Sequence, residues 1–178
     1  MTINENMVKQ PGQRVAVFVD VQNMYYSAKQ LYDSKVNFKA ILEDGVTGRQ
    51  LVRAIAYAIS ADVGKEEKFQ DALSNIGYEV RLKDLQTFYG GAKKGDWDVG
   101  IAMDVLRMTS KVDTIILVSG DGDFKELLEY VKAQGCRAEV MAFSKTASSK
   151  LKNECDLFID LGSSKKYLIK SKKKPSKK

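Results

Sequence analysis

The stretch that decides the fold runs Ile115-Ile-Leu-Val-Ser-Gly-Asp-Gly-Asp-Phe-Lys-Glu-Leu-Leu-Glu129. Its first four residues are apolar and mostly β-branched, which is typical of a strand buried on both faces of a parallel sheet. A helical pattern begins after Asp123. Asp121 and Asp123 therefore lie at the carboxyl end of a central strand, where parallel sheets bind ligands. Two carboxylates so close repel each other, and a divalent metal ion is one natural reason to keep both ionised.

Strand and helix patterns alternate through the rest of the chain. The run 51–60 has a length that suits either element, and we interpret it as a strand because a helical pattern follows it. Gly77 and Gly135 each stand between a helix and a strand, as helix-ending glycines do. The other expected strands are 14–21, 79–85, 137–142 and 156–161, and the expected helices are 23–32, 38–42, 66–75, 99–110 and 150–154. This alternation predicts an α/β fold with helices on both faces of a mainly parallel sheet.

Length and charge suggest one folded domain with two polar ends. The 178 residues, 44% of them hydrophobic, suffice for one core. We expect a flexible N-terminus at 1–12, a domain at 13–162 and a disordered Lys-rich tail at 163–178. The tail has eight lysines and no acid, so the net charge of +6 leaves 21 basic and 23 acidic residues elsewhere. The tail is either a nucleic-acid-binding arm or only a solubilising end.

Several classes of chemistry are excluded by composition. The chain has no histidine, which rules out Ser-His-Asp and Cys-His catalysis. With only Cys136 and Cys155, a disulfide and a structural zinc site are both disfavoured. No apolar run is long enough for a signal peptide or a membrane span, so we expect a cytoplasmic protein with no membrane partner. Hydrolysis would have to rely on carboxylates, lysines or metal-activated water.

Other acids are expected to join the pair that follows the central strand. Asp20 ends the first strand, and Asn23 follows it by three residues. Asp98 begins the helix expected after residue 98. If the first and central strands are neighbours, four carboxylates and one amide surround a single crevice. Hard oxygen ligands of this kind suit Mg²⁺ or Mn²⁺, and the usual substrate of such a site is a phosphodiester.

Each candidate ligand also has a structural interpretation. Asn23 and Asp123 are good helix N-caps, and Asp123 with Glu126 forms a capping box. Asp98 or, alternatively, Asp96 is a further candidate cap. Asp20 is harder to explain in this way, because an acid after a run of apolar strand residues is costly unless a partner compensates it.

Four further residues are weaker candidates. Asp104 follows Asp98 by six residues, which places it about 120° round the helix, so we interpret it as a surface acid or, at most, an outer neighbour of the site. Asp156 begins a strand, where a ligand would more naturally end one, and it has the same outer role at most. Lys93 and Lys94 either contact RNA phosphates or balance nearby acids.

The acids stand in four short motifs: Phe18-Val-Asp20-Val-Gln-Asn23, Lys94-Gly-Asp-Trp-Asp98-Val, Val118-Ser-Gly-Asp121-Gly-Asp123-Phe and Cys155-Asp156-Leu-Phe-Ile-Asp160. Their order and spacing over residues 13 to 161 resemble the NYN domain, most closely its LabA-like bacterial branch, within the PIN-like nuclease superfamily. The resemblance implies a three-layer α/β/α sandwich and metal-dependent RNA cleavage. It assigns catalysis to Asp20, Asp98, Asp121 and Asp123, and metal ligation to these four and Asn23.

Two functions remain open. The first is a metal-dependent endoribonuclease acting on single-stranded RNA with Mg²⁺ or Mn²⁺, and the second is a non-catalytic regulator that binds RNA or a nucleotide on the same fold, either of them compatible with a homodimer. The complete acidic set favours the enzyme. A Toprim or sugar-transferase site is disfavoured because an Asp-x-Asp motif alone is weak evidence, and a dinucleotide site because the third glycine is missing.

Overall fold

The computed structural model describes residues 9–60, 63–84, 86–87, 93–94 and 96–170. Its centre is a six-stranded sheet in which every neighbouring pair is parallel. The strand order is β4 (Glu79–Asp84), β3 (Gln50–Ser60), β1 (Arg14–Asp20), β7 (Thr114–Val118), β8 (Arg137–Ala142) and β9 (Leu157–Asp160). The predicted α/β class, and the strand at 51–60, are confirmed.

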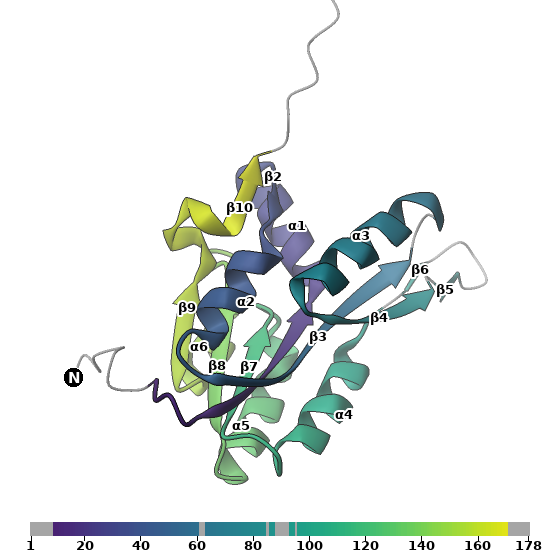
Figure 1. Cartoon of the computed structure of the whole chain (residues 1–178). Helices are drawn as coiled ribbons and strands as arrows, with labels where there is room; N and C mark the ends of the chain where they lie inside the picture. Colours follow the sequence, from purple (N-terminus) through teal and green to yellow (C-terminus); the bar gives the residue numbers. More distant parts are fainter. Residues whose placement is uncertain (1–8, 61–62, 85, 88–92, 95, 171–178) are drawn as a thin grey trace, which may run out of the picture.

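Helices cover both faces of this sheet (Figure 1). On one face α2 (Phe38–Val46) and α3 (Val63–Ile76) contact each other and pack against β1, β3 and β4. On the other face α4 (Asp98–Met108) and α5 (Lys125–Ala133) contact each other and pack against β1 and β8. The remaining helices are α1 (Val21–Tyr32) and α6 (Ser149–Glu154). The result is the expected three-layer, PIN-like sandwich.

Short elements complete the described chain. Three 3₁₀ turns are η2 (Gly122–Phe124), η3 (Leu161–Ser163) and η4 (Lys165–Tyr167). Two small antiparallel pairs join β2 (Ser34–Val36) to β10 (Leu168–Lys170) and β5 (Gln86–Thr87) to β6 (Lys93–Lys94).

The direction of winding changes between β1 and β7. From β1 the chain moves outward to β3 and β4, and from β7 it moves outward on the other side to β8 and β9. Val19 of β1 lies beside Val118 of β7 in the parallel register. Asp20 and Ser119 therefore leave the sheet side by side. A switch point of this kind leaves a crevice at the carboxyl edge, because the connections on its two sides run away from each other.

The two central strands form the middle of the core. Val15 to Val19 in β1 and Ile115 to Val118 in β7 are almost completely buried. β-branched side chains suit this environment because their restricted rotamers pack well on a pleated surface covered from both sides. The continuous apolar runs in the sequence are thus explained by helices lying on both faces.

Helix α2 is longer than the sequence indicated. It was expected at 38–42, with a loop after it, but it continues to Val46. Gly45 explains the difference, because a Cβ atom there would lie 3.3 Å from the Met141 sulfur and 3.6 Å from Ile116 Cδ1. The glycine that resembled a loop signal is instead the point where the helix approaches the sheet closely.

The domain extends beyond the boundary expected at residue 162. Leu168 pairs with Val36 in the β10–β2 ladder, and the buried Tyr167 donates a hydrogen bond to Asp44 Oδ2 at 2.5 Å. The expectation of a disordered tail is therefore wrong for residues 163–170, and 171–178 lie outside the described residues. At the other end, residues 1–8 are outside the description, whereas Lys9 Nζ donates to the Asp44 carbonyl at 3.0 Å.

A buried ion pair links the loop before β3 to strand β8. Arg49 and Glu139 are both fully buried as side chains and form two hydrogen bonds, of 2.9 and 2.8 Å. Arg49 also donates to the Gly45 carbonyl at 2.6 Å, and Arg137 donates to Glu139 at 2.7 Å. Charges removed from water in this way are tolerated only because each is matched, so loss of one partner leaves the other uncompensated.

We expect Glu139→Ala to lower the free energy of unfolding by about 3–5 kcal/mol, because Arg49 would be left buried without its counter-ion. Urea denaturation at neutral pH measures the change. Glu79→Ala is the matched control, because Glu79 makes the same two-bond contact with Arg53 on a solvent-exposed surface. Its cost should stay below about 1 kcal/mol. If both variants lost the same free energy of unfolding, burial would not be what makes the loss of Glu139 costly.

We expect a chain ending after Gly162 to lose about 3 kcal/mol of stability or more, because it lacks the buried Tyr167 and strand β10. A chain ending after Lys170 is the control, since it keeps both. Thermal melts of the two truncated proteins beside the full chain make the comparison. The expectation fails if both truncations melt together with the full chain.

Candidate metal centre

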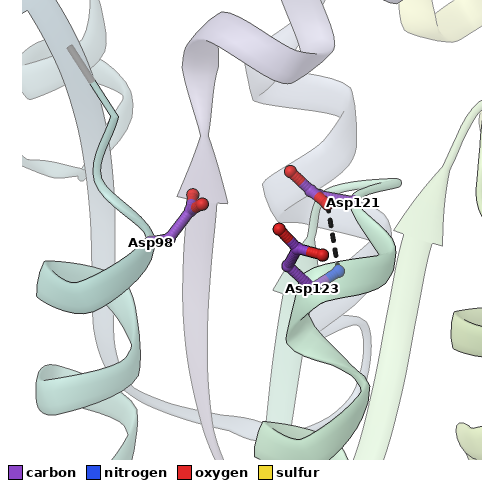
Figure 2. A group of neighbouring side chains, drawn as sticks. All are labelled: Asp98, Asp121 and Asp123. Carbon is purple, nitrogen blue, oxygen red and sulfur yellow. Dashed lines mark hydrogen bonds between the residues drawn. The ribbon is translucent and has the colours of Figure 1, made fainter. Parts of the chain in front are cut away.

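Three carboxylates meet at the carboxyl edge of the sheet. Asp98, the first residue of α4, faces Asp121 and Asp123, which lie on the segment after β7 (Figure 2). Each residue offers one oxygen atom, and these three atoms lie within 4.8 Å of one another. The segments that provide them are brought together because α4 packs against β1 beside β7.

Asp20 is close enough to interact electrostatically with Asp98 and Asp121, but it has a different environment. Its Oδ1 accepts a hydrogen bond from the Asn23 backbone N–H at 3.0 Å, and Oδ2 accepts one from the Ser119 hydroxyl at 3.3 Å. Burial is the main cause that raises the pKa of this carboxyl, and the charge of Asp121 raises it further. The two hydrogen bonds that the Asp20 carboxylate accepts are the partners expected to offset the cost of its burial. Asp20 is not one of the three closely grouped carboxylates.

The side chain of Asn23 is hydrogen-bonded to the segment that follows β7. Its side-chain oxygen accepts a hydrogen bond from the Gly120 backbone N–H at 3.0 Å. The oxygen expected to coordinate metal is therefore used to hold the segment after β7 against the start of α1. Ser119, which the sequence did not single out, has a similar role, because it also accepts from the Asp121 N–H at 3.2 Å.

The residues that cap helices are not those that the sequence suggested. Asp20 is the N-cap of α1, and Asp121 caps η2 by accepting from the Asp123 N–H at 3.0 Å. The N-cap residues of α4 and α5 are Trp97 and Phe124, and neither makes a side-chain cap hydrogen bond. The interpretations of Asn23, Asp98 and Asp123 as N-caps are wrong. Helix capping therefore does not account for the positions of Asp98 and Asp123.

Crowded negative charge changes the acidity of Asp98. Burial is the main cause that raises its pKa to about 6, and the charges of Asp121, Asp96, Asp20 and Asp123 add to it in that order. The protein thus holds like charges together at a position where a cation would relieve their repulsion.

Two aromatic residues fix the start of α4, and with it Asp98. Trp97 donates from Nε1 to the Ala58 carbonyl at 2.8 Å, and its ring lies 5.3 Å from that of Tyr57. The Tyr57 hydroxyl then donates to Asp104 Oδ2 at 2.9 Å. Strand β3 and helix α4 are thereby joined both before and after Asp98. This arrangement limits how far the Asp98 carboxylate can move from the other two acids.

Asp104 is not the surface acid that its position on the helix indicated. It is 6% exposed, and it forms ion pairs with Arg81 at 3.3 Å and with Arg107 at 3.0 Å, besides accepting from Tyr57. Its oxygens are not among the three grouped at the candidate site. The structure gives it a packing role, one and a half turns along α4 from Asp98.

Asp156 lies at the amino ends of the strands, whereas the grouped carboxylates lie at the carboxyl ends. Its Oδ2 accepts from the Ala138 N–H at 2.8 Å, near the amino end of β8, so the expected outer role at the site is not supported. Lys93 and Lys94 form the backbone of β6, but their side chains lie outside the described residues.

Two lysines, neither of them named as a candidate from the sequence, border Asp123. Lys125 and Lys150 line a depression of about 540 Å³ together with Gly122, Asp123 and Glu126. The loop before α6 packs closely there, and a Cβ atom at Gly122 would lie only 2.6 Å from the Ser148 hydroxyl. Nothing in the sequence distinguishes Lys150 from the other lysines, because its position depends on contact between distant segments.

The donor set fits a hard divalent ion. Three carboxylates, each able to offer one oxygen, match the preference of Mg²⁺ and Mn²⁺ for oxygen ligands and for keeping several waters. Besides burial, the charges of the neighbouring carboxylates raise the pKa of Asp98, and a cation at this position would relieve that repulsion.

Comparison with known proteins identifies the family. The family model of the NYN domain matches residues 14–163. The chain belongs to the NYN domain family. It is 28% identical over 171 residues to the Low amplitude and bright protein LabA of Synechococcus elongatus, with 90% of each chain covered. It also matches the crystal structure of a Vibrio parahaemolyticus protein of unknown function, with a TM-score of 0.82 and 33% identity over 89% of this chain and 97% of the other.

These matches confirm the resemblance read from the motifs and support an RNA-related function for this NYN domain. Among the described residues, no helix is both long and apolar enough to span a membrane.

We expect Asp98→Asn to stabilise the metal-free NYN domain at pH 8. Because the pKa of Asp98 is raised from 3.8 to about 6, its contribution to stability is complete below pH 3.8 and is lost as the pH rises through 6. The uncharged variant avoids this loss, by about 1 kcal/mol after allowance for partial exposure. Thermal melts in EDTA at pH 8 and pH 5 measure the difference, which should shrink at pH 5.

With Mn²⁺ in place of EDTA, wild type should be more stable than Asp98→Asn, because wild type then gains metal-binding energy that the variant lacks. A variant less stable than wild type in EDTA at pH 8 would show that the Asp98 carboxylate is stabilised by contacts rather than strained by repulsion.

Proposed function

We propose that this NYN domain is a metal-dependent ribonuclease that hydrolyses phosphodiester bonds in single-stranded RNA. The observation that carries the proposal is the grouping of Asp98, Asp121 and Asp123 at the switch point of a parallel sheet, with their oxygens within 4.8 Å. Family membership supports the nuclease class independently of this geometry. Histidine chemistry is absent from the whole chain, so the acids and an ion are the natural agents of hydrolysis.

The three grouped carboxylates would hold Mg²⁺ or Mn²⁺. Such an ion supplies neutralisation of phosphate charge and a lowered pKa for water. Asp20 adds negative charge behind the group, while Asn23 and Ser119 hold the ends of β1 and β7 in register. Lys125 and Lys150 stand beside Asp123, where their ammonium groups can contact the phosphates of a bound strand.

Asp121 is the most direct residue to test. We expect Asp121→Asn to lower Mn²⁺-dependent cleavage by about 100-fold or more. The change removes one of the negative charges that would hold the ion against the substrate phosphate. The amide oxygen can still accept from the Asp123 N–H, so η2 is retained. Cleavage of an end-labelled 20-nucleotide single-stranded RNA on denaturing gels measures the rate, with EDTA as the metal-free condition.

Asp33→Asn is the matched control. It makes the same chemical change at an exposed residue whose left-handed φ of 45° suits asparagine, and it lies outside the acid cluster. Its activity should equal that of wild type. Equal cleavage by all three proteins would identify a contaminating nuclease, and RNA binding without cleavage under Mg²⁺ or Mn²⁺ would make the domain a non-catalytic RNA-binding regulator.

A further inference from the structure

An apolar cleft opens between helices α1 and α3. It has a volume of about 650 Å³, and the ends of β2, β3, β4 and β10 also line it. Five of the ten exposed large hydrophobic residues in the described chain lie here, namely Tyr25, Tyr26, Phe69, Leu82 and Ile169. Scattered apolar residues need no explanation, but a concave group of this kind marks a binding surface.

The lining is chemically mixed in a particular way. Tyr25 and Tyr26 are 50% and 60% exposed, and their rings pack edge to face at 5.7 Å. Gln22 and Gln70 contribute amide groups and Lys35 a positive charge, whereas none of the described lining residues is acidic. Aromatic faces, amides and one cation match a nucleobase and its phosphate. Purely aliphatic partner side chains would leave the amides and hydroxyls without hydrogen bonds.

The cleft lies close to the acidic site along two strands. Val21 and Gln22 line it and directly follow Asp20, the last residue of β1. Ala58 also lines it, and the Ala58 carbonyl accepts the hydrogen bond from Trp97, the neighbour of Asp98. Residues at the carboxyl ends of β1 and β3 therefore connect the cleft to the segments that carry the carboxylates.

We propose that this cleft binds the bases of the single-stranded RNA that flank the phosphate held at the acidic site. This inference rests on the proposed ribonuclease function and assigns it a base-binding subsite. Tyr25 and Tyr26 stack on successive bases, Gln22 and Gln70 bond to base edges, and Lys35 contacts the backbone. Because stacking accepts any base, the subsite selects unpaired strands rather than a sequence, since the bases of a duplex are already stacked on one another.

The test replaces Tyr26 in the full chain. Tyr26→Leu should weaken binding of a fluorescein-labelled 10-nucleotide single-stranded RNA by about ten-fold, while Tyr26→Phe, which keeps the ring, should bind nearly as wild type. Fluorescence anisotropy is measured in the Asp121→Asn background, where cleavage is not expected. In proteins that retain Asp121, Tyr26→Leu should raise KM by a similar factor with little change in kcat.

Tyr130→Leu is the matched control, because Tyr130 is 42% exposed on α5 and outside the cleft. Thermal melts with and without Mn²⁺ of the variants that retain Asp121 check that each variant is folded and still responds to the ion. Both the control and the Mn²⁺ response should match wild type.

The outcomes separate this inference from the function on which it rests. Active wild type with unchanged RNA affinity and KM in Tyr26→Leu would overturn the subsite and leave the ribonuclease in place. If wild type does not cleave RNA but Tyr26→Leu still loses about ten-fold in RNA affinity, the ribonuclease function is overturned and the base-binding subsite is kept. If Tyr26→Leu instead converts a dimer to a monomer by light scattering, at unchanged RNA affinity, the cleft is an interface with a second copy and the subsite is wrong.

Discussion

The parallel pairing of β1 with β7 is the contact on which the candidate site depends. It places Asp20 beside Ser119 and makes the point where the winding of the sheet reverses. The Ser119 hydroxyl and the Asn23 side-chain oxygen then join the two chain segments as they leave the sheet. Because these polar contacts join the two segments, the side chains of Asp98 and Asp123 are not needed to hold the backbone there.

The distinction between structural and ligand-binding acids follows from this geometry. The sequence offered Asn23, Asp98 and Asp123 as helix caps as well as ligands. In the structure Asp20 and Asp121 are the caps, while Asp98 and Asp123 begin or precede helices without capping them. Asp121 does both, because one oxygen accepts from a backbone N–H and the residue still belongs to the grouped acids. Spacing along a chain identifies good capping residues but cannot choose among neighbours that compete for one position.

Much of the fold was predictable because its signals are local. Continuous apolar runs identified β1 and β7, and alternation of elements identified the parallel sheet. The failures involve contacts between distant segments. Gly45 reads as a loop residue until Met141 and Ile116 are seen against it, and Asp104 reads as a surface acid until Tyr57, Arg81 and Arg107 surround it. Residues 163–170 read as a tail because the strand that pairs with β10 lies more than 120 residues earlier.

The span of the Asp20–Ser119 contact also bears on how the protein is made. These residues are 99 positions apart, and Asp121 and Asp123 follow the second of them. A growing chain holds only Asp20 and Asp98 from the acidic site until residue 121 has been joined. The crowded charges therefore arise together with the sheet that organises them, and no shorter nascent chain contains a complete site. Completion of the site is thus tied to synthesis of the central strand.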